Sequence, residues 1–111
     1  MAKDLSISML MDFYGQLLTQ KRYDTLDMYY NQDMSLSEIA EEIGISRQGV
    51  RDNIKHGELQ LAELEEKLGL AGRFSDILKD IRNIKSIISE MPYSKEAERI
   101  KSLIDHISKN I

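Results

Sequence analysis

The chain has 111 residues, of which 41% are hydrophobic and 31% are charged, with one proline and no cysteine. This composition favours a helical, soluble globular protein and excludes disulfides and thiolate metal sites. The formal net charge of −4 argues against a protein whose whole surface grips nucleic acid, so any such contact requires a local patch. The missing cysteines, the absence of a signal-peptide pattern and the lack of an apolar run of about 20 residues predict a cytoplasmic protein.

Apolar residues at helical spacing predict two helices in the first thirty positions. The first covers about residues 4–18, with Leu17 on its buried side. Thr19 is a candidate N-cap for the second, which continues to about Tyr30. Three tyrosines of this second helix lie at helical spacing, so we interpret them as core residues rather than as platforms for unpaired bases: Tyr23, Tyr29 and Tyr30.

Residues 35–55, SLSEIAEEIGISRQGVRDNIK, have the pattern of two short helices joined by a tight turn. Ser35 followed three residues later by Glu38 is a capping box, which predicts the start of the first of these helices. Gly44 suits the left-handed conformation that ends a helix. Ser46 is the predicted cap of the next helix, which has no strong breaker before residue 68.

Such a pair of helices crosses at a steep angle, which requires a small residue at the contact and apolar residues around the corner. Ala40 is the small residue, and the sealing residues are Ile39, Ile43, Ile45, Val50 and Ile54. Further along the predicted helix, leucines mark an apolar side: Leu59, Leu61, Leu64 and Leu68. The pattern therefore predicts an all-α fold with a helix-turn-helix core.

The side chains that this core directs outward have the chemistry of a nucleic-acid contact. Arginine can pair with two acceptors of guanine, and glutamine with two groups of adenine, in the major groove. We expect Arg47, Gln48 and Arg51 to contact base edges, and Ser46 and Lys55 to contact phosphates. The segment from residue 44 to 56 holds three basic residues and one acid, which makes it a local basic patch in an acidic chain.

The second half of the chain predicts a helical extension. A glycine-containing segment at residues 69–72 indicates a boundary, so we assign residues 1–70 to the helix-turn-helix domain and residues 71–111 to a helical hairpin. Pro92 ends the first hairpin helix and Ser94 caps the second. Broad isoleucine stripes on both helices either cover the first domain or form a homodimer interface, and we favour the homodimer.

Several short motifs carry a resemblance to a known family. They are MDFY at 11–14, LLT at 17–19, YY at 29–30, SRQ at 46–48, DNIK at 52–55 and EEKL at 65–68. With these motifs, the chain from about residue 5 to 70 resembles the YlxM family of helix-turn-helix regulators, and the segment at residues 35–55 resembles region 4 of bacterial sigma factors. The resemblance to the YlxM family implies a link to the signal recognition particle, because genes of this family tend to lie beside the gene for the GTPase of the particle.

The sequence offers no convergent set of catalytic residues, so we expect no enzyme activity, cofactor or metal. The two histidines, His56 and His106, are fifty positions apart, which does not match zinc-ligand spacing. Two functions remain open. The first is a DNA-binding regulatory protein that uses the helix-turn-helix. The alternative is an accessory protein that does not bind DNA and contacts the GTPase or the RNA of the signal recognition particle.

Overall fold

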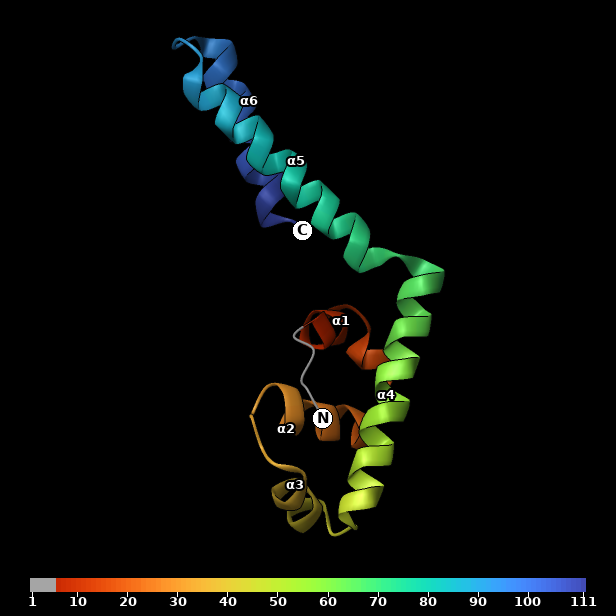
Figure 1. Cartoon of the computed structure of the whole chain (residues 1–111). Coiled ribbons are helices and arrows are strands. Elements are labelled where there is room, and N and C mark those ends of the chain that lie inside the picture. Colours follow the sequence, from red (N-terminus) through yellow and green to blue (C-terminus); the bar gives the residue numbers. More distant parts are fainter. Residues whose placement is uncertain (1–5) are drawn as a thin grey trace. The chain divides into compact units, whose positions relative to one another are not determined.

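A computed structural model of the chain describes residues 6–111, and within this range every element is helical (Figure 1). The predicted all-α fold is therefore confirmed. The chain divides into two compact units, unit 1 (Met1–Ala71) and unit 2 (Gly72–Ile111). The elements are α1 (Ser6–Tyr14), the 3₁₀ helix η1 (Gly15–Leu17), α2 (Gln20–Tyr30), α3 (Leu36–Ile43), α4 (Arg47–Leu68), α5 (Leu70–Glu90) and α6 (Lys95–Lys109).

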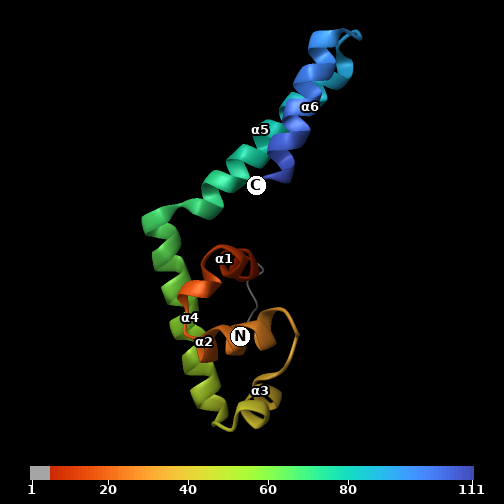
Figure 2. The ribbon, with the colours of Figure 1, turned by 180° about the vertical axis from the view of Figure 1, so that it is seen from behind.

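Helix α4 is the central helix of unit 1, and α1, α2 and α3 all pack against it (Figure 2). Three of its side chains, Val50, Ile54 and Leu61, are completely buried. Their spacing of four and seven residues keeps them on one side of the helix. The buried core of the unit comprises Ile7, Met11, Tyr14, Leu18, Leu26, Tyr29, Tyr30, Ile39, Ala40, Val50, Ile54 and Leu61.

The predicted first helix was wrong at its end and in one buried position. Helix α1 stops at Tyr14, and the chain tightens into η1 instead of continuing as an α-helix to residue 18. A Cβ atom at Gly15 would lie 2.6 Å from the Tyr23 ring, so a side chain here would force that ring to move. The tighter 3₁₀ turn changes the direction in which the following side chains point, with the result that Leu18 is buried and Leu17 is 59% exposed. The predicted start at residue 4 lies outside the described residues.

Local capping interactions begin the later helices as predicted. The Thr19 hydroxyl oxygen accepts from the Arg22 N–H at 3.2 Å at the start of α2, and the Ser94 hydroxyl oxygen accepts from the Ala97 N–H at 3.0 Å at the start of α6. Two predicted apolar positions on α4 were wrong, because Leu59 is 62% exposed and Leu68, the last residue of the helix, is 44% exposed. Leu59 is two residues from the buried Gly57, about 200° round the helix.

The junction between α4 and α5 is a single residue, Gly69, in the left-handed conformation with φ of 63°. Gly69 provides no capping side chain for α5, and two side chains of unit 1 take that role. The Tyr14 hydroxyl donates to Glu65 Oε1 at 2.5 Å and accepts from the Leu70 N–H at 3.0 Å, while the same Glu65 oxygen accepts from the Ala71 N–H at 3.0 Å. Burial, reinforced by the Glu65 carboxylate, raises the pKa of the Tyr14 hydroxyl.

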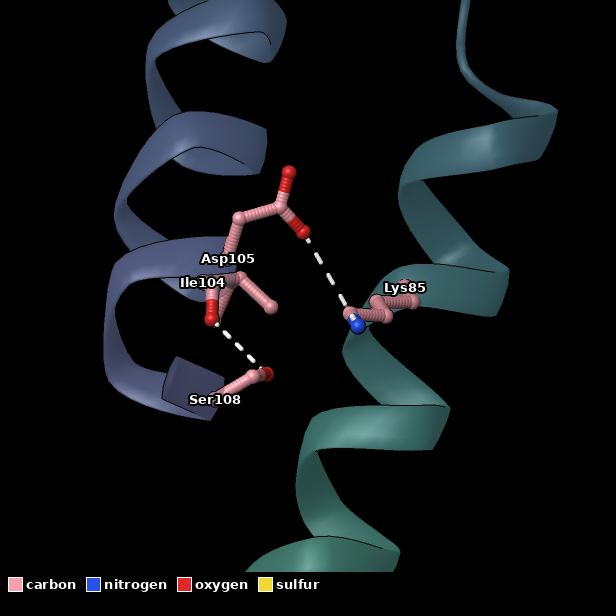
Figure 3. A network of polar contacts seen from close by, with 4 residues as sticks. All are labelled: Lys85, Ile104, Asp105 and Ser108. Carbon is pink, nitrogen blue, oxygen red and sulfur yellow. Dashed lines mark hydrogen bonds and ion pairs between the residues drawn. The ribbon is translucent and has the colours of Figure 1, made fainter. Parts of the chain in front are cut away.

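Unit 2 is a hairpin of two antiparallel helices, α5 and α6 (Figure 1). Its interior is thin, because only Ile81, Ala97 and Ile104 are buried among its described apolar residues. Lys85 Nζ on α5 lies 3.8 Å from Asp105 Oδ1 on α6, and Figure 3 shows the two side chains directed toward one another. Among residues 6–111, no helix is both long enough and apolar enough to span a membrane.

Candidate nucleic-acid interface

The helix-turn-helix begins with the predicted capping box. The Ser35 hydroxyl oxygen accepts from the Glu38 N–H at 3.0 Å, and Glu38 Oε1 accepts from the Ser35 N–H at 3.0 Å. These hydrogen bonds stabilise the carboxylate, so they lower the pKa of Glu38 below its ordinary value of 4.5. The box fixes the first turn of α3, the helix that precedes the candidate interface.

The turn between α3 and α4 is held by short-range hydrogen bonds. Gly44 has φ of 73°, and its N–H and that of Ile45 both donate to the Ala40 carbonyl oxygen, at 2.9 and 3.2 Å. The Ser46 hydroxyl oxygen then accepts from the Gly49 N–H at 3.0 Å and caps α4. Behind the turn, the side chain of Ile39 packs in the core with no exposed surface. The start of α4 is thus fixed both by its cap and by the core.

The five residues predicted to contact nucleic acid are all exposed: Ser46, Arg47, Gln48, Arg51 and Lys55. Arg47, Arg51 and Lys55 are spaced four residues apart, which places their Cα atoms along one side of α4. The stripe covers about 12 Å of helix, a length comparable with the width of the major groove. Arg47, Gln48 and Arg51 also line a shallow depression in the surface.

The Gln48 side chain is already engaged within α4. Its amide nitrogen donates to Asp52 Oδ1 at 2.9 Å, one helical turn further along. A primary amide has two N–H donors and a carbonyl acceptor, so this bond leaves Gln48 able to make a paired contact with adenine. Asp52 therefore orients Gln48 and also lowers the positive charge beside Arg51.

Ser46 has a structural role that limits its functional one. Its oxygen is the acceptor for the α4 cap, while its hydroxyl proton can still be donated to a phosphate oxygen. The early N–H groups of α4 point in the same direction as this cap and favour negative charge. A phosphate contact at this end of α4 is therefore compatible with the cap.

A polar network on the other side of α4 ties the helix to α2, and the sequence did not reveal it. The Arg22 side chain donates through Nε to Asn53 Oδ1 and through Nη1 to Gln60 Oε1, both at 3.1 Å. Asn53 Nδ2 donates to the Thr25 hydroxyl at 2.9 Å, and that hydroxyl donates to the Lys21 carbonyl at 2.8 Å. The network holds the helix that presents the basic stripe.

The DNIK motif at residues 52–55 divides its roles between the two sides of α4. Asp52 orients Gln48 and Asn53 binds the α2 side chains. Ile54 is fully buried, whereas Lys55 is exposed. Four consecutive residues turn through most of a helical circle, so the motif links the candidate interface directly to the core.

A second residue that the sequence did not single out is Gly57, at the contact between α4 and α2. A Cβ atom added here would lie 2.7 Å from Leu26 Cδ1 and 3.2 Å from its Cγ. Leu26 is completely buried and therefore has little room to move. The two helices approach as closely as they do because residue 57 has no side chain.

The tyrosines of α2 are packed inside unit 1. Tyr29 and Tyr30 are buried, their rings meet edge to face with centroids 5.0 Å apart, and the Tyr30 hydroxyl donates to Glu58 Oε1 on α4. Tyr23 is partly buried against Gly15. The buried pair agrees with the expected core role.

The basic stripe lies in an acidic unit. Unit 1 contains 7 Lys and Arg residues against 13 Asp and Glu, whereas residues 44–56 contain three basic residues and one acid. Glu41 and Glu42 on the preceding helix are exposed. A polyanion is attracted to the start of α4 and repelled by the flanks, which restricts where it can bind.

Neither histidine belongs to a metal site in the part of the chain that the structure describes. His56 is exposed on α4 and His106 is exposed on α6. No group of three or more His, Cys, Asp or Glu residues within residues 6–111 is arranged to hold a metal ion.

Comparison with known proteins assigns the chain to a family. Residues 1–107 match the family described as "Putative helix-turn-helix protein, YlxM / p13 like". The chain belongs to this family. It is 45% identical to a UPF0122 protein of Acetivibrio thermocellus, covering 96% of this chain and 97% of the relative. UPF0122 proteins of Clostridium kluyveri, 40% identical over the full length of both chains, and of Bacillus cereus, 42% identical over 96% of each, are also similar. The helix-turn-helix at residues 35–55 agrees with the description of this family.

Proposed function

We propose that the chain is a DNA-binding regulatory protein and not an enzyme, and that the start of α4 enters the major groove. The observation that carries the proposal is the exposed stripe of Arg47, Arg51 and Lys55 on a helix fixed by a cap, a core and a polar network. Arg47, Gln48 and Arg51 would contact base edges. Ser46 and Lys55 would contact phosphates and set the register of the protein on the duplex.

The direct test is a fluorescence-anisotropy titration of the full chain against labelled random duplex DNA at two salt concentrations. In a plot of log affinity against log salt, the Lys55 phosphate contact alone predicts a slope of about −0.9 for each bound copy, and the slope reaches about −2.7 if Arg47 and Arg51 also neutralise phosphates on a random duplex. Tight and salt-sensitive binding supports the proposal. Absence of binding at low salt rejects it.

Substitutions at Arg47 separate base contact from phosphate contact, once a preferred site is selected from the random duplexes. Arg47→Ala should cost about 1–3 kcal/mol at that site and much less on unrelated sequences. Arg47→Lys keeps the charge and loses the paired geometry, so it should retain nonspecific binding while losing preference. Lys67→Ala, an exposed cation in the last turn of the same helix, is the matched control and should change neither. Equal losses on all sequences would make Arg47 a phosphate contact, and no loss would remove it from the interface.

A homodimer is part of the proposal. Two copies related by a twofold axis would present two α4 helices to two half-sites, which increases both affinity and specificity. The support is the large apolar exposure of unit 2, which has a thin interior of its own. Half-site spacing in the selected duplexes would report the separation of the two helices.

A second candidate function has one observation in its favour. The basic stripe is small and the whole chain has a net charge of −4, which suits a protein or a structured RNA as well as naked DNA. In this alternative, the chain is an accessory protein of the signal recognition particle and contacts its GTPase or RNA. Titration against that RNA under the same conditions, and co-elution with the purified particle at low salt, distinguish it. RNA binding without duplex binding would favour the alternative.

A further inference from the structure

Unit 2 leaves most of its large apolar side chains exposed. Eight of its large apolar side chains are between 37% and 62% exposed. On α5 they are Ile77, Ile84 and Ile87, with Met91 directly after the helix, and on α6 they are Ile100, Leu103 and Ile107, with Ile111 after the helix.

These eight side chains lie on one side of the hairpin. Relative to the buried Ile81, the exposed residues of the first stripe are rotated by about 40° to 120° in one sense around the helix, and those of the second stripe by about 20° to 100° in the same sense relative to Ile104. The two helices run antiparallel side by side (Figures 1 and 2), so rotations in the same helical sense bring both stripes to the same face. We call this two-helix surface the apolar face.

The opposite edge of the hairpin is polar and already partnered. Lys85 follows Ile84 and is therefore turned about 100° away from the apolar face, where it approaches Asp105 (Figure 3). The ion pair joins the helices from the side that does not carry the isoleucines. The hairpin is thus amphipathic as a unit, with one apolar face and one charged edge.

The spacing within the apolar face identifies the kind of partner. Ile77 and Ile84 on α5 and Met91 directly after it are spaced seven residues apart, and Ile100 and Ile107 repeat the interval on α6. A seven-residue apolar repeat fits other helices of similar length that lie almost parallel to it, as in a four-helix bundle. A second copy of the hairpin has two such helices with the same repeat.

The exposed area of the apolar face is also as large as the area that a stable dimer buries. The exposed parts of the eight side chains amount to roughly 700 Å² per copy, or about 1,400 Å² for two, which is in the range of specific protein–protein interfaces. A patch of this size exceeds what monomeric proteins usually expose. We therefore propose that two copies pair through their apolar faces and form an antiparallel four-helix bundle. This proposal specifies the dimer of the proposed function and requires none of its DNA contacts.

The first test is the mass of the full chain in solution without DNA, measured by sedimentation equilibrium over a range of concentrations. The expected mass is twice 12.8 kDa. A mass of one chain at all concentrations would overturn the proposal. A monomer that still bound duplex DNA would leave the proposed DNA contacts intact, so the two failures are distinguishable.

The second test locates the interface with matched variants. Ile87 on the apolar face and Leu59 on α4 are both 62% exposed. Ile87→Glu should weaken the dimer at least about 100-fold, because twofold symmetry buries the new charge twice. Leu59→Glu should change the dissociation constant less than about twofold.

A third variant and a measurement of folding distinguish loss of the dimer interface from unfolding of the chain. Ile107→Glu, on the other helix of the same face, should weaken the dimer as Ile87→Glu does. Hydrogen exchange of the α4 amides in each variant should show that unit 1 stays folded. Equal effects at Ile87 and Leu59, or no effect at Ile87 and Ile107, would overturn the assignment of the apolar face.

Discussion

Unit 1 and unit 2 are built from the same kind of amphipathic helix, yet they bury their apolar side chains to different degrees. Unit 1 surrounds α4 with three other helices and completely buries Ile39, Ile54 and Leu61. Unit 2 has one helix–helix contact, and most of its isoleucines remain at least one-third exposed. A central helix with neighbours on several sides buries its apolar side chains in an interior, whereas two helices alone bury only the side chains along their line of contact. The comparison shows that unit 1 has a buried interior of its own, whereas unit 2 leaves most of its apolar side chains exposed.

The largest expected effect comes from removing core volume in unit 1. Ile54→Ala should lower the free energy of unfolding by about 2–5 kcal/mol, because Ile54 is fully buried and its loss leaves a cavity beside α4. Urea denaturation followed by circular dichroism measures the change. Leu59→Ala, on the exposed side of the same helix, is the control and should stay within about 0.5 kcal/mol. Similar changes in the free energy of unfolding for both variants would mean that α4 is not the central packing helix of the unit.

A smaller loss is expected where α4 and α2 meet most closely. Gly57→Ala should destabilise unit 1 by about 1–3 kcal/mol, because the added Cβ would overlap the buried Leu26. Gly44 is unsuitable as the control, since its positive φ already disfavours alanine. Gly49→Ala is a better one: its Cβ would lie 3.2 Å from Ser46 Oγ, a milder contact that improved helix propensity partly offsets. A stabilising Gly57→Ala would contradict the close approach.

The α3 capping box should contribute about 1 kcal/mol, which Ser35→Ala would remove. The contribution of Glu38 depends on pH. Its pKa is lowered in the folded chain, so the stabilisation is present above the ordinary value of 4.5 and is lost as the pH falls through the lower, folded value. Urea titrations of wild type and Glu38→Gln should therefore differ at neutral pH and converge in acid. If the stability difference between wild type and Glu38→Gln grew on acidification, it would contradict a lowered pKa of Glu38.

The smallest effect is expected from the ion pair of unit 2. Lys85 and Asp105 are 49% and 54% exposed and 3.8 Å apart, so solvent and salt screen their attraction. Lys85→Ala should change the stability of unit 2 by less than about 0.5 kcal/mol, measured as hydrogen exchange of the α6 amides. A loss as large as that of Ile54→Ala would show that the hairpin is held by charge rather than by apolar contact.

The features that the sequence predicted are those fixed within a few residues. The caps at Ser35, Ser46 and Ser94 each join groups three positions apart, so the local pattern is enough to locate them. The left-handed conformation of Gly44 is likewise predictable from the local sequence, because glycine is the residue that most readily ends a helix in this way. The five candidate interface residues are exposed because the apolar positions between them fill the core.

The features that the sequence did not predict join distant positions. Arg22 and Asn53 are 31 residues apart, and Tyr14 and Leu70 are 56 apart. Nothing near Arg22 or Tyr14 in the chain distinguishes them from an exposed cation or an ordinary core tyrosine. The exposure of Leu17 depends on the 3₁₀ turn at Gly15, which in turn depends on the distant packing of Tyr23.

The cap that Tyr14 and Glu65 provide for α5 has a consequence for the order of synthesis. A ribosome makes Tyr14 long before Leu70, so the hydroxyl that receives the first N–H of α5 is in position only if the earlier helices have already assembled. Until then, the start of α5 lacks these two acceptors and is free to fray. The first turn of α5 is therefore secured only after α1 has packed against α4.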